Sequence, residues 1–166
     1  MAISRLNHAV LYVRDAEATA AFYSELLGFE VANAFPGGVF MRVAPDSPND
    51  HDIAFFSIGA GAGPSTAGRA SVGLYHLAWE VPTLRELLEL RARLLEAGSL
   101  AGESDHGVSK SLYCKDPDGI EFELMWAVPV DRLTEADAVT TKAIDWDAAV
   151  QRFGLDTVSV TEIAAP

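Results

Sequence analysis

Several features that would point to a particular partner or compartment are missing from this sequence. Cys114 is the only cysteine, so no internal disulfide can form. No apolar run approaches the roughly 20 residues that a membrane-spanning helix needs. Lysine and arginine total 12 against 24 aspartate and glutamate residues and are not clustered, which gives a formal net charge of -12. These absences argue against nucleic acid and anionic membranes as partners, and favour a small molecule or another protein.

Two signals of other functions are also missing. The first residues enter a strand-like segment without the apolar core of a signal peptide, so we expect a cytoplasmic protein. The glycine-rich stretch after Gly59 lacks the Gly-Lys-Ser/Thr ending of a phosphate-binding loop and is typical of a connector.

The composition, 49% hydrophobic and 22% charged over 166 residues, is that of an ordinary globular protein. Such a chain can form one substantial core or two small modules that share a sheet.

The predicted elements run twice through the same order: a strand, a helix and three strands. In the first half Asp15 is the expected N-cap of the helix and Gly28 its end. In the second half Thr83 and Glu86 form a capping box, and Gly98 ends the helix. The expected strands are 5–13, 29–35, 39–44, 53–58 and 73–81, with three more near 100–106, 108–115 and 120–126.

A histidine recurs at the same place in both halves. Leu6-Asn7-His8-Ala9 opens the first half, and Leu74-Tyr75-His76-Leu77 opens the second about 68 residues later. This repeat predicts two βαβββ modules related by pseudo-twofold symmetry, which would bring His8 and His76 to matching places on facing sheets. The expected bounds of the modules are 5–59 and 72–127, with a connector at 60–71 and the end of the domain at 130.

A turn signal, Asp116-Pro117-Asp118-Gly119, lies in the second half. Proline presets φ, aspartate bonds to its own backbone and glycine accepts a positive φ, so we expect a hairpin here. Beyond the turn, side chains alternate with the period of a strand. This puts Glu123 in mid-strand beside apolar neighbours, where an unpaired carboxylate is costly and a metal or a hydrogen-bond donor is the usual remedy. Glu121 has the same strand parity and is the rival carboxylate.

The two repeated histidines and this carboxylate form a candidate metal site. Two histidines and one carboxylate on one face bind non-haem Fe(II) and leave neighbouring coordination positions open. We therefore predict that His8, His76 and Glu123 hold a metal ion. The alternative for each histidine alone is a core residue with a satisfied hydrogen bond. The predicted fold is α+β, a cupped mixed sheet of two modules around this site, followed by a helical C-terminal extension.

The stretch around the turn resembles a known family. A histidine, a gap, an aliphatic residue, a tyrosine, Asp-Pro-x-Gly and a glutamate follow one another as in the type I extradiol dioxygenases of the vicinal oxygen chelate superfamily, such as the catechol 2,3-dioxygenases. The residues that match are His106, Leu112, Tyr113, Asp116, Pro117, Gly119 and Glu123. Ser104 departs from the pattern, which has Gly, Asn, Thr, Ile or Val there.

The resemblance implies a site and a reaction. The three predicted ligands would hold Fe(II), or alternatively Mn(II), and the substrates would be a small aromatic diol of the catechol type and O2. His51 would be the acid–base residue, Tyr113 would hydrogen-bond the substrate oxygen, and His106 would help to position the substrate. The ring would open beside its two hydroxyl groups. A homodimer or higher homo-oligomer is the expected assembly.

Other functions within the same superfamily are the alternatives. Glyoxalase-type lyases have a fourth metal ligand in the last strand of the first module, where counting back from the turns places Ala54, which cannot ligate. Fosfomycin-resistance-like transferases use three ligands, and an epimerase is a further possibility. Proteins that resemble the bleomycin-resistance proteins bind a small molecule without a metal and lack the histidine and glutamate set.

Residues 131–166 lie outside the repeat. Helices are predicted over 133–143 and 146–153. We expect this extension either to cover the opening of the site or to join a subunit contact.

Overall fold

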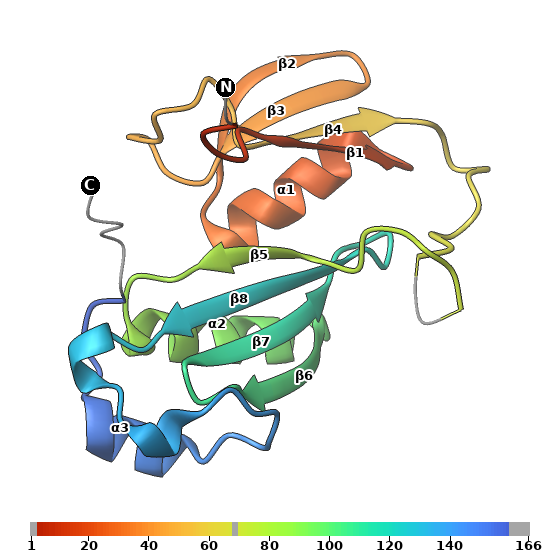
Figure 1. Cartoon of the computed structure of the whole chain (residues 1–166). Coiled ribbons are helices and arrows are strands. Elements are labelled where there is room, and N and C mark those ends of the chain that lie inside the picture. The colour runs from red at the N-terminus through yellow and green to blue at the C-terminus, as the bar shows by residue number, and fades with distance from the viewer. Residues whose placement is uncertain (1–2, 68–69, 160–166) are drawn as a thin grey trace. The chain divides into compact units, whose positions relative to one another are not determined.

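The computed structural model describes residues 3–67 and 70–159 of the chain. It divides into two compact units, of which the first comprises Met1–Thr66 and Asp116–Gly119 and the second Ala67–Lys115 and Ile120–Pro166. Each unit contains one four-stranded mixed sheet with a helix against it (Figure 1). The predicted α+β fold with two βαβββ modules is therefore confirmed.

The first unit has the strand order β1-β4-β3-β2, with β1 and β4 parallel and the other neighbours antiparallel. Its elements are β1 (Ala9–Val13), α1 (Ala16–Leu27), β2 (Glu30–Phe35), β3 (Gly38–Arg42) and β4 (Ile53–Ser57). The predicted helix caps are confirmed, since the Asp15 side chain accepts a hydrogen bond from Ala18 N at 3.0 Å and Gly28 ends α1 with φ 80°. Tyr23 packs α1 onto the sheet, with its ring centroid 4.9 Å from that of Phe55.

The second unit repeats this topology with the order β5-β8-β7-β6. Its elements are β5 (Leu77–Glu80), α2 (Leu84–Glu96), β6 (Leu100–Asp105), β7 (Ser109–Lys115) and β8 (Glu121–Ala127). Thr83 caps α2 by accepting a hydrogen bond from Glu86 N at 3.2 Å. The predicted hairpin joins β7 to β8, and Gly119 adopts the positive φ, 79°, that the turn requires.

The duplication extends to the register of the strands. In the second sheet Glu123 of β8 lies between a residue of β5 and a residue of β7, and Ala54 of β4 has the same place in the first sheet. The two matching rows are Val10, Ala54 and Phe40 in the first sheet and Ala78, Glu123 and Tyr113 in the second. The outer strands also share a shift in the register of their pairing, which follows Val31 in β2 and Leu100 in β6.

The C-terminal segment packs on the second unit only in part as a helix. The helix predicted over 133–143 is wrong: this stretch holds the short 3-10 turn η2 (Glu135–Asp137), which follows η1 (Val130–Arg132). Thr134 and Asp137 cap each other across η2, and beyond it Lys142 forms an isolated antiparallel bridge with Asp105 of β6. The second predicted helix is confirmed as α3 (Trp146–Phe153). Residues 160–166 of the segment lie outside the described residues.

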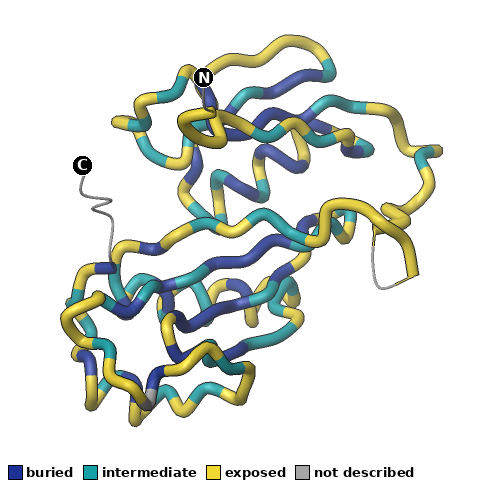
Figure 2. The backbone as a smooth tube through the Cα atoms, viewed as in Figure 1, coloured by how far each residue is buried: buried dark blue, intermediate teal, exposed yellow. Residues whose placement is uncertain are grey.

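Burial is concentrated on β7 and β8 in the second unit, whereas β2 in the first unit is exposed along its length (Figure 2). The C-terminal segment adds to the second core. Trp126 of β8 is fully buried, its indole N–H donates to the carbonyl of Thr157 at 3.0 Å, and its ring packs 5.3 Å from that of Phe153. This contact explains why the segment is ordered against β8.

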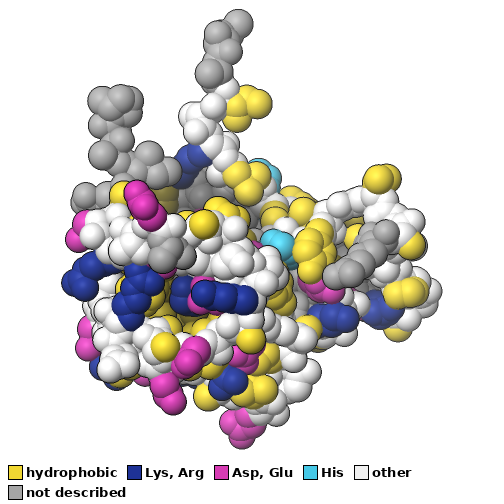
Figure 3. All heavy atoms as spheres, turned by 60° about the horizontal axis from the view of Figure 1, so that its bottom comes forward, with side chains coloured by type: hydrophobic (Ala, Val, Ile, Leu, Met, Phe, Trp, Pro, Cys, Tyr) yellow, Lys and Arg dark blue, Asp and Glu magenta, His cyan; other side chains and the backbone are white. Residues whose placement is uncertain are grey.

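The charged side chains form local pairs. In the second unit Arg85 pairs with Asp156, Arg91 with Glu103 and Arg152 with Asp137. Figure 3 shows basic and acidic side chains near one another on one face of the molecule. Within the described residues, no helix combines the length and the apolar character needed to cross a membrane.

Candidate functional site

The second unit brings together two of the three predicted metal ligands. Glu123 lies in mid-strand and is only 8% exposed, and His76 directly precedes β5. Because β5 pairs in parallel with β8 and Ala78 lies opposite Glu123, His76 is on the same face of the sheet. His76 Nε2 is 2.9 Å from Glu123 Oε2. The structure thus favours Glu123 over Glu121 as the carboxylate beside His76.

Tyr113 and His106 continue this row of polar groups. Tyr113 lies directly opposite Glu123 in the β7–β8 pair, and its ring centroid is 5.6 Å from that of His76. The Tyr113 hydroxyl is 2.8 Å from His106 Nε2. Burial raises the pKa of Tyr113, and the negative charge of Glu123 raises this pKa further. The phenol therefore stays protonated at neutral pH and is able to donate a hydrogen bond.

The second ring nitrogen of His106 determines which atoms carry protons. His106 Nδ1 lies 2.9 Å from the backbone carbonyl oxygen of Thr140. A carbonyl only accepts, so Nδ1 carries a hydrogen, and in the neutral ring Nε2 accepts the hydroxyl of Tyr113. In the protonated ring both nitrogens donate, which frees the Tyr113 hydroxyl to donate elsewhere. One proton on His106 thus switches the donor role of Tyr113.

The first unit brings the other two histidines together. His8 precedes β1 and His51 precedes β4, and these strands run parallel with Ala9 opposite Ile53. Both histidines therefore lie at the same end of the sheet, with ring centroids 4.4 Å apart. The ring of Phe40 packs edge-on against His51 at 4.9 Å. His51 is buried, whereas His8 is exposed.

A polar neighbour orients each of these two histidines. The side-chain oxygen of Asn7 is 2.8 Å from His8 Nδ1. A carboxylate oxygen of Asp50 is 3.0 Å from His51 Nδ1, and this hydrogen bond lowers the pKa of Asp50. Both oxygens accept, so Nδ1 carries the hydrogen and Nε2 of the neutral ring keeps its lone pair. In this state His8 is able to ligate a metal through Nε2, and His51 is able to accept a proton there.

The His76–Glu123 pair has the spacing of two ligands of one ion. Neighbouring ligands of an octahedral ion with bonds of about 2.1 Å lie about 3 Å apart, and the two atoms of this pair are 2.9 Å apart. An imidazole and a carboxylate also suit Fe(II) and Mn(II) as donors. Across residues 3–67 and 70–159, no group of three or more histidine, cysteine, aspartate or glutamate side chains is assembled that could hold an ion. His8 belongs to the first unit, and its participation stays a prediction.

The place equivalent to Glu123 in the first sheet is taken by Ala54. Ala54 is fully buried between β1 and β3, and its side chain carries no donor atom. The pairing register of the strands thus gives Ala54 the same position that was found by counting residues back from the two turns. The first sheet therefore offers a histidine before its first strand but no carboxylate in the matching row.

The sequence analysis did not identify the groups that orient three of the four histidines. Asn7 and Asp50 directly precede His8 and His51, so a polar residue beside a candidate histidine was the available signal. Thr140 acts on His106 through its backbone carbonyl from 34 residues away. No sequence pattern marks such a contact.

Comparisons of the sequence with known proteins identify the family and several relatives. The chain matches the model of the family described as Glyoxalase/Bleomycin resistance protein/Dioxygenase superfamily over residues 5–124. It is 30% identical over 155 residues to the catechol-2,3-dioxygenase of Bacillus subtilis (strain 168), covering 91% of this chain and 53% of that protein. It is 34% identical over 121 residues to biphenyl-2,3-diol 1,2-dioxygenase 3 of Rhodococcus globerulus, covering 72% and 62%. The chain thus spans less than two thirds of either dioxygenase.

The chain is also similar to proteins that are not named as dioxygenases alone. The ethylmalonyl-CoA/methylmalonyl-CoA epimerase of Cereibacter sphaeroides is 32% identical over 144 residues, covering 74% of this chain and 97% of the epimerase. Among solved structures, a glyoxylase/bleomycin resistance protein/dioxygenase domain from Frankia sp. EAN1pec superposes with a TM-score of 0.61 at 21% identity. That match covers 78% of this chain and 96% of the domain. At this identity, the likeness shows a shared fold alone.

Proposed function

We propose that this chain, which belongs to the Glyoxalase/Bleomycin resistance protein/Dioxygenase superfamily, is an Fe(II)-dependent extradiol dioxygenase. Its substrates would be a small catechol-type aromatic diol and O2, and the ring would open beside the two hydroxyl groups. The proposed metal ligands are His8, His76 and Glu123. His8 is included because it has the same place before its strand as His76, and its Nε2 keeps a lone pair.

One observation carries the proposal: the His76–Glu123 pair shares a face of the sheet with a phenol and a second imidazole. Tyr113 is in register with Glu123, and His106 is hydrogen-bonded to Tyr113. Burying the Glu123 carboxylate costs several kcal/mol unless its charge is compensated, and a cation bound by Glu123 and His76 would compensate it. The four groups together support a metal-dependent enzyme that handles protons at a substrate oxygen.

The side chains have separate parts in the proposed reaction. When bound, Fe(II) supplies a chelation site for the diol and the electron transfer to O2. Tyr113, whose pKa is raised, keeps its own hydrogen and donates it to Nε2 of His106, while its oxygen accepts a hydrogen bond from a substrate hydroxyl and favours loss of that proton. Neutral His106, with its hydrogen on Nδ1, supplies the lone pair at Nε2 that accepts the Tyr113 hydroxyl. His51 accepts a proton at Nε2, with Asp50 stabilising the imidazolium, and returns it later.

An epimerase of the same superfamily is the second candidate, because an epimerase is matched over almost its full length. A four-ligand lyase has less support, since Ala54 stands where the row needs a carboxylate. The oxygen requirement separates the candidates. Only the dioxygenase consumes O2 and forms a yellow ring-opened product.

The test is anaerobic purification with metal analysis, followed by oxygen uptake with a panel of catechols. We expect iron near one ion per chain and uptake of about one O2 per diol consumed. His76→Ala should lose both the iron and the uptake. Iron-free protein whose activity survives this substitution, or iron-loaded protein without uptake, would exclude the dioxygenase.

Two further predictions accompany the proposed function. A homodimer or larger homo-oligomer is expected from the resemblance, and light scattering on the purified protein measures it directly. A cytoplasmic location is expected, since a chain with a single cysteine forms no internal disulfide and needs no oxidising compartment.

A further inference from the structure

The turn between β6 and β7, which carries His106, is paired with a distant part of the chain. Asp105 N donates to the carbonyl of Lys142 at 2.8 Å, and Lys142 N donates to the carbonyl of Asp105 at 3.1 Å. Thr140 N donates to the carbonyl of His106 at 3.3 Å. We call residues 137–142 the strap. The strap lies along the edge of the turn as a short antiparallel partner.

Gly107 shows how closely the strap approaches the turn. Its φ is +75°, and a Cβ built on it would lie 2.5 Å from the carbonyl oxygen of Ala138 and 2.9 Å from that of Asp137. Any side chain at this position would push the strap away. Glycine therefore permits a direct backbone contact between the strap and the residue that follows His106.

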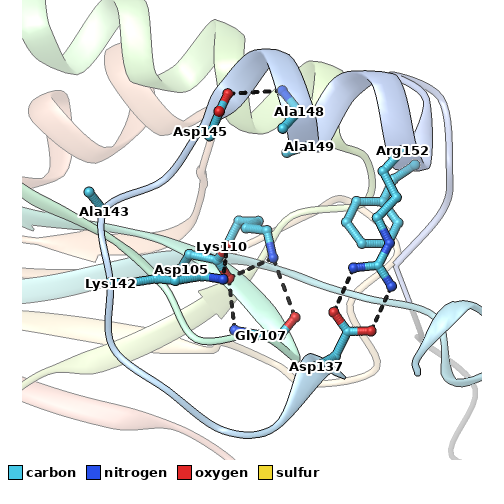
Figure 4. Close-up of a pocket in the computed structure, with 11 residues that line it drawn as sticks. Asp105, Gly107, Lys110, Asp137, Lys142, Ala143, Asp145, Ala148, Ala149 and Arg152 are labelled. Atoms are coloured by element: carbon cyan, nitrogen blue, oxygen red, sulfur yellow. Dashed lines mark hydrogen bonds and ion pairs between the residues drawn. The ribbon is translucent and has the colours of Figure 1, made fainter. Parts of the chain in front are cut away.

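Ion pairs fasten the strap and the turn from two sides (Figure 4). Arg152 of α3 holds Asp137 through two hydrogen bonds of 2.6 Å, and these bonds keep the pKa of Asp137 below its usual range. Lys110, which is 4% exposed, donates to Asp105 at 2.8 Å and to the Gly107 carbonyl at 3.3 Å. A cavity of about 320 Å³ is lined by both ion pairs. Backbone hydrogen bonds hold the strap to the turn, and the Arg152–Asp137 ion pair fastens the start of the strap to α3 beside this cavity.

The strap also acts on the imidazole of His106. The carbonyl oxygen of Thr140 accepts the Nδ1 hydrogen at 2.9 Å, and Nε2 faces the Tyr113 hydroxyl at 2.8 Å. Without the carbonyl, the hydrogen can move to Nε2, and Nε2 then can no longer accept from Tyr113 in the neutral ring. The backbone of residue 140 thus determines the tautomer of an imidazole whose other nitrogen is bonded to Tyr113, the strand neighbour of Glu123.

We propose that Thr140 is a positioning residue for His106, and that Arg152 and Asp137 hold it in place. This inference rests on the proposed function, in which His106 and Tyr113 act on the substrate. The C-terminal segment is then a part of the reaction site through its backbone. Its effect reaches the substrate only through the imidazole of His106.

The test compares two arginine substitutions in the same unit. Arg152→Gln removes the pair that fastens the strap. Arg85→Gln is the matched control, because Arg85 makes an equivalent two-bond pair with Asp156, at 2.7 and 3.0 Å, beyond the strap. Both variants lose one arginine–carboxylate pair. Arg152→Lys, which keeps the charge, should recover part of any loss.

The first measurement is nitrogen NMR of histidine in the metal-free protein. We expect His106 in the wild type and in Arg85→Gln to carry its hydrogen on Nδ1, and Arg152→Gln to show a mixture of tautomers. The second is steady-state oxygen uptake, where kcat of Arg152→Gln should fall about tenfold to a hundredfold with little change in KM. Circular dichroism identifies a variant that fails to fold, in which case Asp137→Asn, which weakens the same ion pair from its other side, replaces Arg152→Gln in both measurements.

The possible failures are distinguishable. If the wild type takes up no oxygen with any catechol, the proposed function fails, while the NMR experiment still tests the contact between the strap and His106. If the tautomer and kcat of Arg152→Gln match those of Arg85→Gln, the positioning role is excluded. A tautomer change without a change in kcat also excludes it.

Discussion

The two sheets have the same topology and even the same irregularity in their outer strands, yet one row of residues differs in its chemistry. In the second sheet the row contains a carboxylate and a phenol, Glu123 and Tyr113. In the first sheet the matching places hold Ala54 and Phe40. A histidine precedes the first strand of both. A duplicated backbone thus retained its geometry while two side chains decided which half can supply a carboxylate ligand and a hydroxyl donor.

The outer strands differ in a similar way. β2 of the first sheet is exposed along its whole length. β6 of the second sheet is covered by the C-terminal segment, where the Trp146 indole donates to Glu103 at 2.7 Å and the strap pairs with Asp105. The C-terminal segment thus covers the sheet that contains Glu123. His106, which follows β6, connects this segment with the site, because it is bonded to both Thr140 and Tyr113.

A carboxylate placed in the matching row of the first sheet, at Ala54, is expected to have the largest effect, which is on the stability of the protein. Ala54→Glu would put a charge at a fully buried position without a designed partner, so the free energy of unfolding should fall by about 3–5 kcal/mol. Urea denaturation of the metal-free protein measures this change. Ala54→Gln has the same size without the charge and should be less destabilising at neutral pH. Equal losses in the two variants would mean that size alone excludes a longer side chain there.

Removing the carboxylate from the second row should have the next largest effect. Glu123→Gln keeps the shape of the side chain but weakens it as a ligand, so the iron content should drop and turnover should fall at least about a hundredfold. Metal analysis and oxygen uptake report the two effects separately. Glu121→Gln is the matched control on the same strand, and a comparable loss in that variant would transfer the ligand role to Glu121.

Making the two rows alike at the aromatic position gives a smaller change. Tyr113→Phe copies Phe40 and removes the hydroxyl between His106 and the substrate, so kcat should fall about tenfold, the equivalent of one lost hydrogen bond. The packing of the ring is retained, and stability should hardly change. Tyr12→Phe removes a hydroxyl at an exposed position and serves as the control. An unchanged kcat in Tyr113→Phe would reduce Tyr113 to a packing residue.

The smallest effect concerns one carboxylate in each unit, the buried Asp52 and the half-buried Asp105. Burial opposes ionisation of Asp52 and Asp105, but hydrogen bonds outweigh it and lower both pKa values, with Val43 N donating to Asp52 and Lys110 to Asp105. Their stabilisation is therefore complete above the unfolded pKa of about 3.9 and is lost as pH falls through the lower folded pKa. Each should contribute about 1 kcal/mol.

Urea denaturation across the acid range measures this pH dependence. Stability of the wild type should fall more steeply below about pH 4 than that of Asp52→Asn or Asp105→Asn, because neither amide titrates. High salt should weaken only the Asp105 contribution, since its partner is a cation, whereas the hydrogen-bond donors to Asp52 are uncharged. Parallel acid profiles for all three proteins would contradict the prediction.

Most of the fold followed from local patterns. The helix caps at Asp15 and Thr83, the turn at Asp116–Gly119 and the repeated histidine motif were all readable because each depends on residues close together in the chain. The helix expected over 133–143 was wrong because pairing with β6 and the cap between Thr134 and Asp137 outweigh its local propensity. The pairing with β6 is a tertiary contact and leaves no periodic signal.

The order of residues was enough to predict the duplicated modules, the buried carboxylate and the histidines beside it, because strand periodicity and turn chemistry act over a few neighbouring positions. Folding decided which atoms meet: that His76 faces Glu123 rather than Glu121, and that the backbone of Thr140 sets the proton on His106. These contacts join residues 34 or more positions apart, through strand register and backbone groups that every residue possesses. No side-chain pattern along the chain encodes them.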